Sequence, residues 1–161
     1  MAKEIERKFL VKNFEQLKPG LGSPWLYQQG YIANNSSGVV RVRVMRWRNW
    51  HERAYITIKS SGTLERDEWD FELRDVDLAQ EMLEAMCSDL ITKQRYKLVH
   101  EATTWEIDEF LGDNAGLVLA EVELDSVDQL VLLPEWAGAE VTHDTRYYNN
   151  NLATNPYKNW K

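Results

Sequence analysis

Charged and apolar residues alternate with a period of two in one segment after another of this 161-residue chain. In the first such segment, residues 3–11, the side chains of Glu4, Glu6 and Lys8 share one face if the backbone is extended. Successive side chains of a strand point to opposite sides, so this spacing favours strands over helices. A chain built largely from such segments is restricted to sheets with one charged face and one apolar face.

The same period recurs in seven later segments, many of them bounded by Gly, Asn, Ser or Asp. Near residue 40, valines alternate with Arg41 and Arg43, and near residue 120, apolar residues alternate with Glu121 and Glu123. These segments predict about eight strands, at residues 3–11, 26–34, 38–48, 53–60, 65–74, 91–99, 103–110 and 116–125.

Three other stretches favour helices. The first lies between the fifth and sixth strands, where Asp77 is a candidate cap and Gln80 follows three residues later. The second covers residues 126–134, and the third is a short helix that begins after Asp144 and carries Arg146. The apolar stripe of the first helix is expected to consist of Leu78, Met82, Leu83 and Met86.

Length and composition predict a single domain over residues 1–161, because no repeat, linker or long apolar run divides the chain. The single cysteine excludes an internal disulfide, and the first residues lack a secretory signal, so we expect a cytoplasmic protein. A net charge of -7 argues against nonspecific binding to nucleic acid or to an anionic membrane. Residues 41–59 are nevertheless locally basic, which indicates a dedicated anion site.

For any one strand, a half-buried sheet with a solvated outer face explains the alternation. Across the strands, however, acids recur as pairs on some and bases on others, which predicts two opposed charged walls. About eight strands can close into a barrel whose interior holds one small ligand. The expected fold class is therefore α+β, mainly β: a closed eight-stranded antiparallel β-barrel with flanking helices. Its charges would lie inside, and its apolar residues between barrel and helices.

Charges enclosed in a barrel are costly unless they are compensated. The interior becomes tolerable if water fills it and if an anion and divalent cations bind there. A complex of metal and polyphosphate meets both demands.

With these motifs the chain resembles the CYTH family, the triphosphate tunnel metalloenzymes. The signature of that family is Glu-x-Glu-x-Lys near the N-terminus, which here is residues 4–8. The resemblance spans nearly the whole chain through Gln29-Gly30-Tyr31-Ile32, Val40-Arg41-Val42-Arg43, Thr57-Ile58-Lys59, Glu68-Trp69-Asp70, Lys93-Gln94-Arg95-Tyr96, Glu106-Ile107-Asp108 and Glu121-Val122-Glu123.

The resemblance implies a tunnel that hydrolyses or cyclises triphosphate substrates with a divalent metal. It makes Lys93 the candidate general acid, with Tyr31 hydrogen bonding nearby, and leaves Glu72 and Glu106 as network or surface residues. Arg146 either reaches a tunnel mouth as a further substrate contact or pairs with Asp144 on the surface. The implied phosphate-binding residues are Lys8, Arg41, Arg43, Lys59, Lys93 and Arg95. The implied metal ligands are Glu4, Glu6, Glu121 and Glu123, with Glu68, Asp70 and Asp108 as second candidates.

Because the chain is short and has few residues suited to reading a base, the expected reaction is hydrolysis of inorganic tripolyphosphate to pyrophosphate and phosphate. Mg2+ is the expected metal, with Mn2+ as the alternative. A class IV type adenylate cyclase, a thiamine triphosphatase and a noncatalytic polyphosphate- or nucleotide-binding module stay open. The expected partner is a small-molecule triphosphate, with neither nucleic acid nor membrane, and a homodimer through outer aromatic residues stays open as the assembly.

Overall fold

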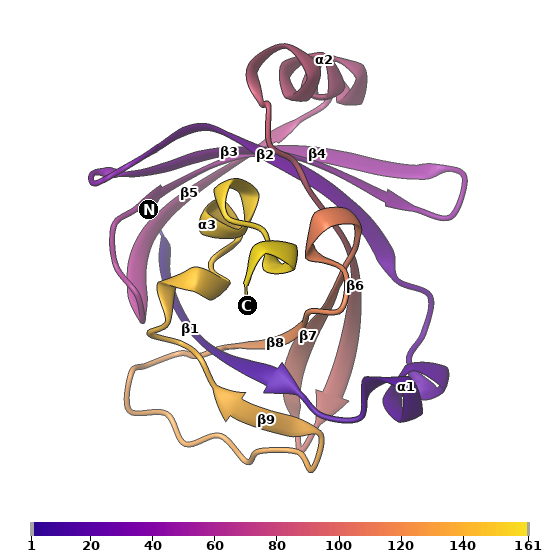
Figure 1. Ribbon diagram of the computed structural model, residues 1–161. Coiled ribbons are helices and arrows are strands. Elements are labelled where there is room, and N and C mark those ends of the chain that lie inside the picture. The colour runs from indigo at the N-terminus through magenta and orange to yellow at the C-terminus, as the bar shows by residue number, and fades with distance from the viewer. Residues whose placement is uncertain (1, 161) are drawn as a thin grey trace.

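Eight antiparallel strands close into a barrel in the computed structural model, which describes residues 2–160 (Figure 1). The strands are β1 (Ala2–Val11), β2 (Trp25–Asn35), β3 (Gly38–Trp47), β4 (His51–Ser60), β5 (Glu65–Leu73), β6 (Ile91–His100), β7 (Thr103–Phe110) and β8 (Val118–Glu123). They are hydrogen bonded in the order β5-β4-β3-β2-β6-β7-β8-β1, and β1 pairs with β5 to close the ring. The predicted fold class is confirmed, and the predicted strands differ from the observed ones by only a few residues at their ends.

A ninth strand, β9 (Ala137–Glu140), pairs with the end of β1 near Phe9 and Val11. The sequence pattern missed it because its residues are Ala-Gly-Ala-Glu, which carry no apolar alternation. The backbone comes close at this point, since a Cβ on Gly138 would lie 3.0 Å from the carbonyl oxygen of Leu10. Small residues therefore suit this strand because it lies close against the backbone of β1, which is distant in the sequence.

The first predicted helix is present as α2 (Val76–Met86), which lies outside the barrel (Figure 1). Its cap is Asp75, whose carboxylate accepts a hydrogen bond from the backbone N–H of Leu78, so the predicted cap at Asp77 is wrong. The predicted stripe is correct for Leu83, which is buried, and for Met82, which packs beside it, but wrong for Leu78 and Met86, which are exposed. Ala79 and Leu83 are the buried residues of the helix. They pack on the outer sides of β3 and β4, which confirms an apolar layer between barrel and helix.

A second apolar layer lies outside β1, β7 and β8. Phe9 packs edge-to-face on Trp105, with ring centroids 5.6 Å apart, and Trp136 covers Trp105 from the other side at 5.3 Å. Ile5 and Ile107 belong to the same cluster. Alternate residues of these strands are therefore fixed outward by packing, which aims the intervening charged residues inward.

The predicted helix over residues 126–134 is wrong, because this segment is irregular apart from a short turn. The side chain of Gln129 accepts a hydrogen bond from the backbone N–H of Asp125, and the backbone N–H of Gln129 donates to Ser126. Leu130 and Leu132 are exposed and do not form a stripe against the barrel. A helix of so few residues is unstable in water without such packing.

The C-terminal segment lies across one end of the barrel, where Figure 1 shows α3 within the ring of strands. Asp144 caps its first turn as predicted, by accepting a hydrogen bond from the backbone N–H of Arg146. Among residues 2–160, no helix is long and apolar enough to cross a membrane. The remaining elements are η3 (Thr145–Tyr147), α3 (Asn149–Thr154), η4 (Tyr157–Asn159), α1 (Phe14–Leu17), η1 (Lys18–Gly20) and η2 (Gly112–Asn114).

We predict that Gly30→Ala destabilises the fold, because a Cβ at residue 30 would lie 2.5 Å from Cβ of Cys87 and 2.9 Å from Leu90. The expected loss in the free energy of unfolding is about 1–3 kcal/mol, measured by urea denaturation. Gly20→Ala is the control, because nothing lies within 4 Å of its added Cβ. Equal stability of the two variants would contradict the close packing of β2 against the end of α2.

Candidate functional site

The barrel encloses a cavity of about 200 Å3 whose wall consists mainly of charged side chains. On β1, Ile5 and Phe9 join the outer apolar layer, whereas Glu4, Glu6 and Lys8 line the cavity. As predicted, the period-two alternation places apolar side chains outside the barrel and charged side chains in the cavity. The predicted site residues that line the cavity are Glu4, Glu6, Lys8, Tyr31, Arg41, Arg43, Lys59, Glu68, Asp70, Lys93, Arg95, Glu121 and Glu123.

Opposite charges on neighbouring strands are paired inside the cavity. Lys59 Nζ lies 2.7 Å from Glu4 Oε1 and 3.2 Å from Glu68 Oε2. Arg95 Nη1 donates to Glu106 Oε2 at 2.7 Å, so Glu106 is a network residue, one of the two roles left open for it. Most inward-facing bases lie on β4, β3 and β6 and most inward-facing acids on β7, β8, β1 and β5, so the two predicted walls are present. They are joined by ion pairs where β4 adjoins β5 and where β6 adjoins β7, and Lys8 and Arg66 are bases within the acidic wall.

Arg41 and Arg43 on β3 are the exception to this pairing. Arg41 Nη2 donates to Thr57 Oγ1 at 2.9 Å, but its buried Nε has no hydrogen-bond partner among residues 2–160. Arg43 Nε donates to the amide oxygen of Gln29 at 2.8 Å. Within residues 2–160, neither guanidinium forms an ion pair with a carboxylate. This side of the cavity therefore carries positive charge that the protein itself does not neutralise.

Burial lowers the pKa of Arg43 to about 10, and the nearby cations of Arg41 and Arg95 act in the same direction. The guanidinium is still charged at neutral pH. Its pKa is lowered because burial and the neighbouring cations destabilise the charged form, and anionic oxygens bound beside it would stabilise that form.

Carboxylates crowd together elsewhere in the cavity. Burial and the neighbouring carboxylates of Glu121 and Glu4 raise the pKa of Glu6 to about 7. Burial, Glu4 and Glu106 likewise raise the pKa of Glu123. In the part of the chain that the structure describes, no three Asp, Glu, His or Cys side chains converge into a ready-made metal site. These oxygen donors fit a hard cation such as Mg2+, which accepts few protein carboxylates and takes its other ligands from water and phosphate.

Asp108 differs from the prediction that made it a second-choice metal ligand. It is completely buried, does not line the cavity, and pairs with two basic side chains. Its Oδ2 accepts from Lys93 Nζ at 2.6 Å and from Arg95 Nη2 at 2.7 Å, and its Oδ1 accepts from Arg95 Nε at 2.6 Å. Both oxygens are thus occupied by donors from β6. The structure indicates that Asp108 positions Lys93 and Arg95, which leaves little room for a metal ion.

Lys93 and Tyr31, the predicted catalytic pair, both line the cavity but do not hydrogen bond to each other. Lys93 Nζ donates to Asn149 Oδ1 at 2.9 Å, and the Gln29 amide donates to the Tyr31 hydroxyl at 3.0 Å. Burial lowers the pKa of Lys93 to about 7, with Arg95 contributing. The ammonium is thereby poised to give up a proton near neutral pH.

Besides Glu106 and the apolar Val39, four residues that line the cavity were not predicted: Arg66 and residues 148–150. Arg66 donates to Glu4 Oε2 at 3.1 Å and to Glu6 Oε1 at 3.2 Å. It shares the inner face of β5 with Glu68, so the period of two was a sufficient signal for it. The others, residues 148–150, come from the C-terminal segment. No local pattern marks them, because only the folded chain brings residue 149 to a strand 56 residues away.

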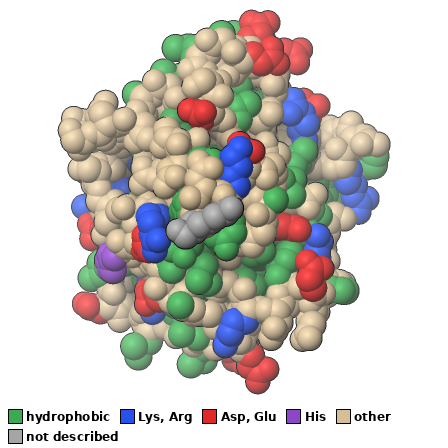
Figure 2. Space-filling model, in the orientation of Figure 1, with side chains coloured by type: hydrophobic (Ala, Val, Ile, Leu, Met, Phe, Trp, Pro, Cys, Tyr) green, Lys and Arg blue, Asp and Glu red, His purple; other side chains and the backbone are tan. Residues whose placement is uncertain are grey.

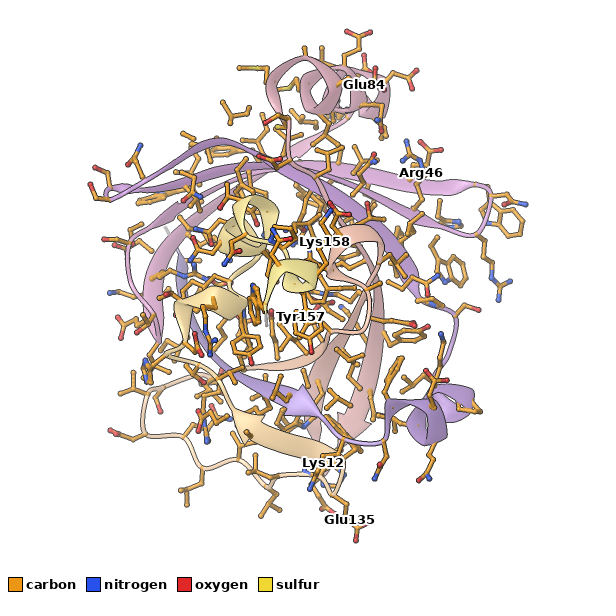
Figure 3. All side chains as sticks on the ribbon, viewed as in Figure 1. Lys12, Arg46, Glu84, Glu135, Tyr157 and Lys158 are labelled. Carbon is orange, nitrogen blue, oxygen red and sulfur yellow. The ribbon has the colours of Figure 1, made fainter. Side chains whose placement is uncertain are left out.

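Arg146 lies outside the cavity lining. Its Nη2 is 2.6 Å from Asp144 Oδ2, and its side chain is 61% exposed. The structure therefore has the surface pair with Asp144, not the predicted contact at a tunnel mouth. Figure 2 shows a mixed surface at this end, with acidic, basic and hydrophobic side chains interspersed. Figure 3 places Tyr157 and Lys158 of the same segment within the outline of the barrel, whereas Glu135 projects outward.

Comparison with known proteins gives one consistent result. The CYTH domain matches residues 2–157. An inorganic triphosphatase of Acetivibrio thermocellus is 45% identical over 100% of this chain and 99% of its own length. One from Nitrosomonas europaea is 34% identical over 93% of this chain and 96% of its own.

Solved structures agree with this result. The crystal structure of an inorganic triphosphatase superposes with a TM-score of 0.64 at 33% identity and covers 95% of each chain. A putative adenylate cyclase from Bacillus halodurans has a TM-score of 0.52 at 17% identity, covers 84% of this chain and 97% of its own, and shares the fold alone. Because the domain match and the relatives extend over nearly all of its residues, this chain belongs to the CYTH domain family.

Proposed function

We propose that this chain is a metal-dependent hydrolase that cleaves inorganic triphosphate to pyrophosphate and phosphate inside its barrel. The observation that carries the proposal is the unneutralised arginine pair of β3, which faces a cavity that also holds crowded carboxylates. Arginine forks suit the oxygens of a phosphate chain, and carboxylates suit the metal that accompanies it. The relatives named inorganic triphosphatase support the same reaction.

The proposed substrate contacts are the cations that line the cavity. Arg41 and Arg43 would bind phosphate oxygens through their guanidinium groups, and Lys8, Lys59 and Arg95 would add charge from other strands. Lys8 is 5% exposed, and its Nζ lies 3.5 Å from Glu121 Oε1. These buried ammonium and guanidinium groups are held by the barrel before substrate arrives, so little reorganisation is needed on binding.

Mg2+, with Mn2+ as the alternative, would be held by carboxylates of the cavity. Bound there, it would neutralise charge on the triphosphate and activate water. Among these carboxylates, Glu6 and Glu123 have raised pKa values, which a bound cation would lower again. At Glu4 and Glu121, by contrast, the effect of burial is outweighed by nearby cationic side chains, which already lower the pKa values. The proposed ligands are Glu4, Glu6, Glu121 and Glu123, with Glu68 and Asp70 as second candidates.

Hydrolysis requires water to attack a terminal phosphorus atom while the bridging P–O bond breaks. A cavity carboxylate would accept the proton of the attacking water. Lys93 would protonate the leaving pyrophosphate oxygen, which its lowered pKa favours. Tyr31 would donate a hydrogen bond to a phosphate oxygen, since its hydroxyl accepts one from Gln29 and faces the cavity.

We further propose that the enzyme acts in the cytoplasm on a small molecule, without nucleic acid or membrane. The free thiol of Cys87 fits a reducing compartment. Trp69 and Phe71 are exposed on the outer side of β5, which supports a homodimer as the proposed assembly.

We expect phosphate release from inorganic triphosphate in the presence of Mg2+ or Mn2+, and none in EDTA. Rates with ATP and thiamine triphosphate should be much lower, because the described lining of the cavity is mostly charged and offers little apolar surface to a base or a thiazolium ring. The measurement is phosphate release from the three substrates in parallel, with detection of cyclic AMP. Cyclic AMP formation from ATP would indicate a cyclase instead, and binding without turnover of any substrate would indicate a noncatalytic module.

Arg41→Lys should lower kcat/KM for triphosphate by about tenfold or more, because an ammonium replaces a guanidinium whose Nε has no protein partner. Arg146→Lys is the matched control, since it makes the same substitution at an arginine that pairs with Asp144 outside the cavity. It should change kcat/KM less than about twofold. Equal losses in the two variants would mean that activity does not depend on a guanidinium at the cavity wall of β3.

Glu6→Gln should stabilise the metal-free protein increasingly as pH rises from about 4.5 to about 7. The folded pKa of Glu6 is about 7 against an ordinary value of 4.5, so the folded state binds more protons across this window. Wild-type stability from this group is therefore complete at low pH and is lost as pH rises through 7. The advantage of the variant should grow by up to roughly 3 kcal/mol, measured by urea unfolding in EDTA.

Glu84→Gln is the control for this pH dependence, because Glu84 projects outward from α2 (Figure 3). Its stability should run parallel to that of the wild type at every pH. If the Glu6→Gln curve were also parallel, the crowding of carboxylates in the cavity would be refuted.

A further inference from the structure

We infer that Asn149 is a positioning residue for Lys93, so that the C-terminal segment completes the catalytic site. This inference rests on the proposed function and assigns a part in it to a segment outside the barrel strands. The cavity is lined from that segment by residues 148–150. Of these, Asn149 alone contacts the proposed general acid among the residues that the structure describes.

The ammonium of Lys93 is held from two directions. It is 1% exposed, and it donates to Asp108 Oδ2 at 2.6 Å and to Asn149 Oδ1 at 2.9 Å. The rings of Tyr27 and Phe110 lie on its flanks, with centroids at 5.8 and 5.4 Å. An ammonium has three N–H donors, so two acceptors leave one donor for a substrate oxygen. Both acceptors are needed to fix where that third donor points.

Asn149 is itself oriented by two donors. Its Oδ1 accepts from Lys93 Nζ and, at 3.4 Å, from Nε2 of Gln29. A flipped Asn149 amide would set its own N–H group against both of these donors, so the acceptor oxygen must face them. Gln29 is completely buried, and its Oε1 accepts from Arg43 Nε at 2.8 Å. One chain of hydrogen bonds therefore connects an arginine of the proposed phosphate site to Lys93.

The C-terminal segment is anchored firmly enough to hold an acceptor in place. Leu152 of α3 is fully buried in the same cluster as Ile91, which lies two residues before Lys93 on β6. Tyr148 OH donates to the carbonyl oxygen of Thr142 at 2.9 Å. Asn149 thus stands at the start of a helix that is packed against the strand whose lysine it orients (Figure 1).

The kinetic test compares two substitutions of similar size. Asn149→Leu removes the acceptor, whereas Asn149→Asp keeps an oxygen at the position of Oδ1. We expect Asn149→Leu to lower kcat for triphosphate about 10- to 100-fold, as for other small misplacements of a reacting group. Asn149→Asp should keep kcat within about fivefold of the wild type, while its added negative charge raises KM.

Asn151→Leu is the matched control, because it makes the same substitution on the same helix away from Lys93. Its side chain donates to the carbonyl oxygen of Thr145 at 2.7 Å. This control should leave kcat within about twofold of the wild type even if it lowers thermal stability. If Asn151→Leu lost as much kcat as Asn149→Leu, the segment would act only as a structural cover, and the inference would be overturned.

A second readout does not depend on turnover. The 1H–15N correlation of a lysine ammonium is observed when hydrogen bonds and burial slow its exchange with water, and Lys93→Met identifies the signal of Lys93. Asn149→Leu should broaden or abolish this signal, whereas Asn149→Asp and Asn151→Leu should retain it. An unchanged signal in Asn149→Leu would refute the positioning role.

The two readouts separate the inference from the proposed function. Wild-type protein that fails to hydrolyse triphosphate but shows the expected ammonium signals would refute the function and leave the contact of Asn149 with Lys93 supported. A raised KM with unchanged kcat in Asn149→Leu would make Asn149 a substrate ligand and overturn its positioning role.

Discussion

The cost of enclosing charge inside a closed barrel is the constraint on which the rest of this structure depends. Apolar packing outside, as between Phe9 and Trp105, fixes alternate residues outward and so forces their charged neighbours inward. Charge removed from water is expensive unless it finds a partner. The observed answer is a basic and an acidic side of the barrel that are joined by ion pairs where they meet, such as Lys59 with Glu4 and Arg95 with Asp108.

The groups that this pairing leaves incompletely neutralised define the site. Arg41 keeps a buried Nε without a partner, and the pKa of Glu6 is raised to about 7 by burial and by adjacent carboxylates. One requires an anion and the other a cation or a proton. A triphosphate bound with a divalent metal satisfies both at once, which explains why one small cavity holds surplus charge of both signs.

The C-terminal segment adds what the strands lack. A barrel strand offers a side chain to the interior at every second residue, but it cannot close the end of the barrel. Residues 148–150 line the cavity from the segment that lies across one end, and they bring amide and aromatic groups to a wall that is otherwise mostly ionic. Asn149 is a neutral acceptor for Lys93, so it orients the ammonium without adding another negative charge beside it. The same segment thus both lines one end of the cavity and positions the buried Lys93.

The sequence by itself determined the strands, their inward faces and most of the cavity lining, because side-chain direction in a strand follows a local period of two. The same rule could have predicted that Arg66 lines the cavity. Only the tertiary structure decided that Asp108 pairs with basic side chains of β6, that Arg146 lies outside the cavity and that Asn149 contacts Lys93. It also decided that residues 126–134 form no helix and that β9 pairs with β1. These outcomes depend on which distant groups meet when the barrel closes, and periodicity carries no information about such encounters.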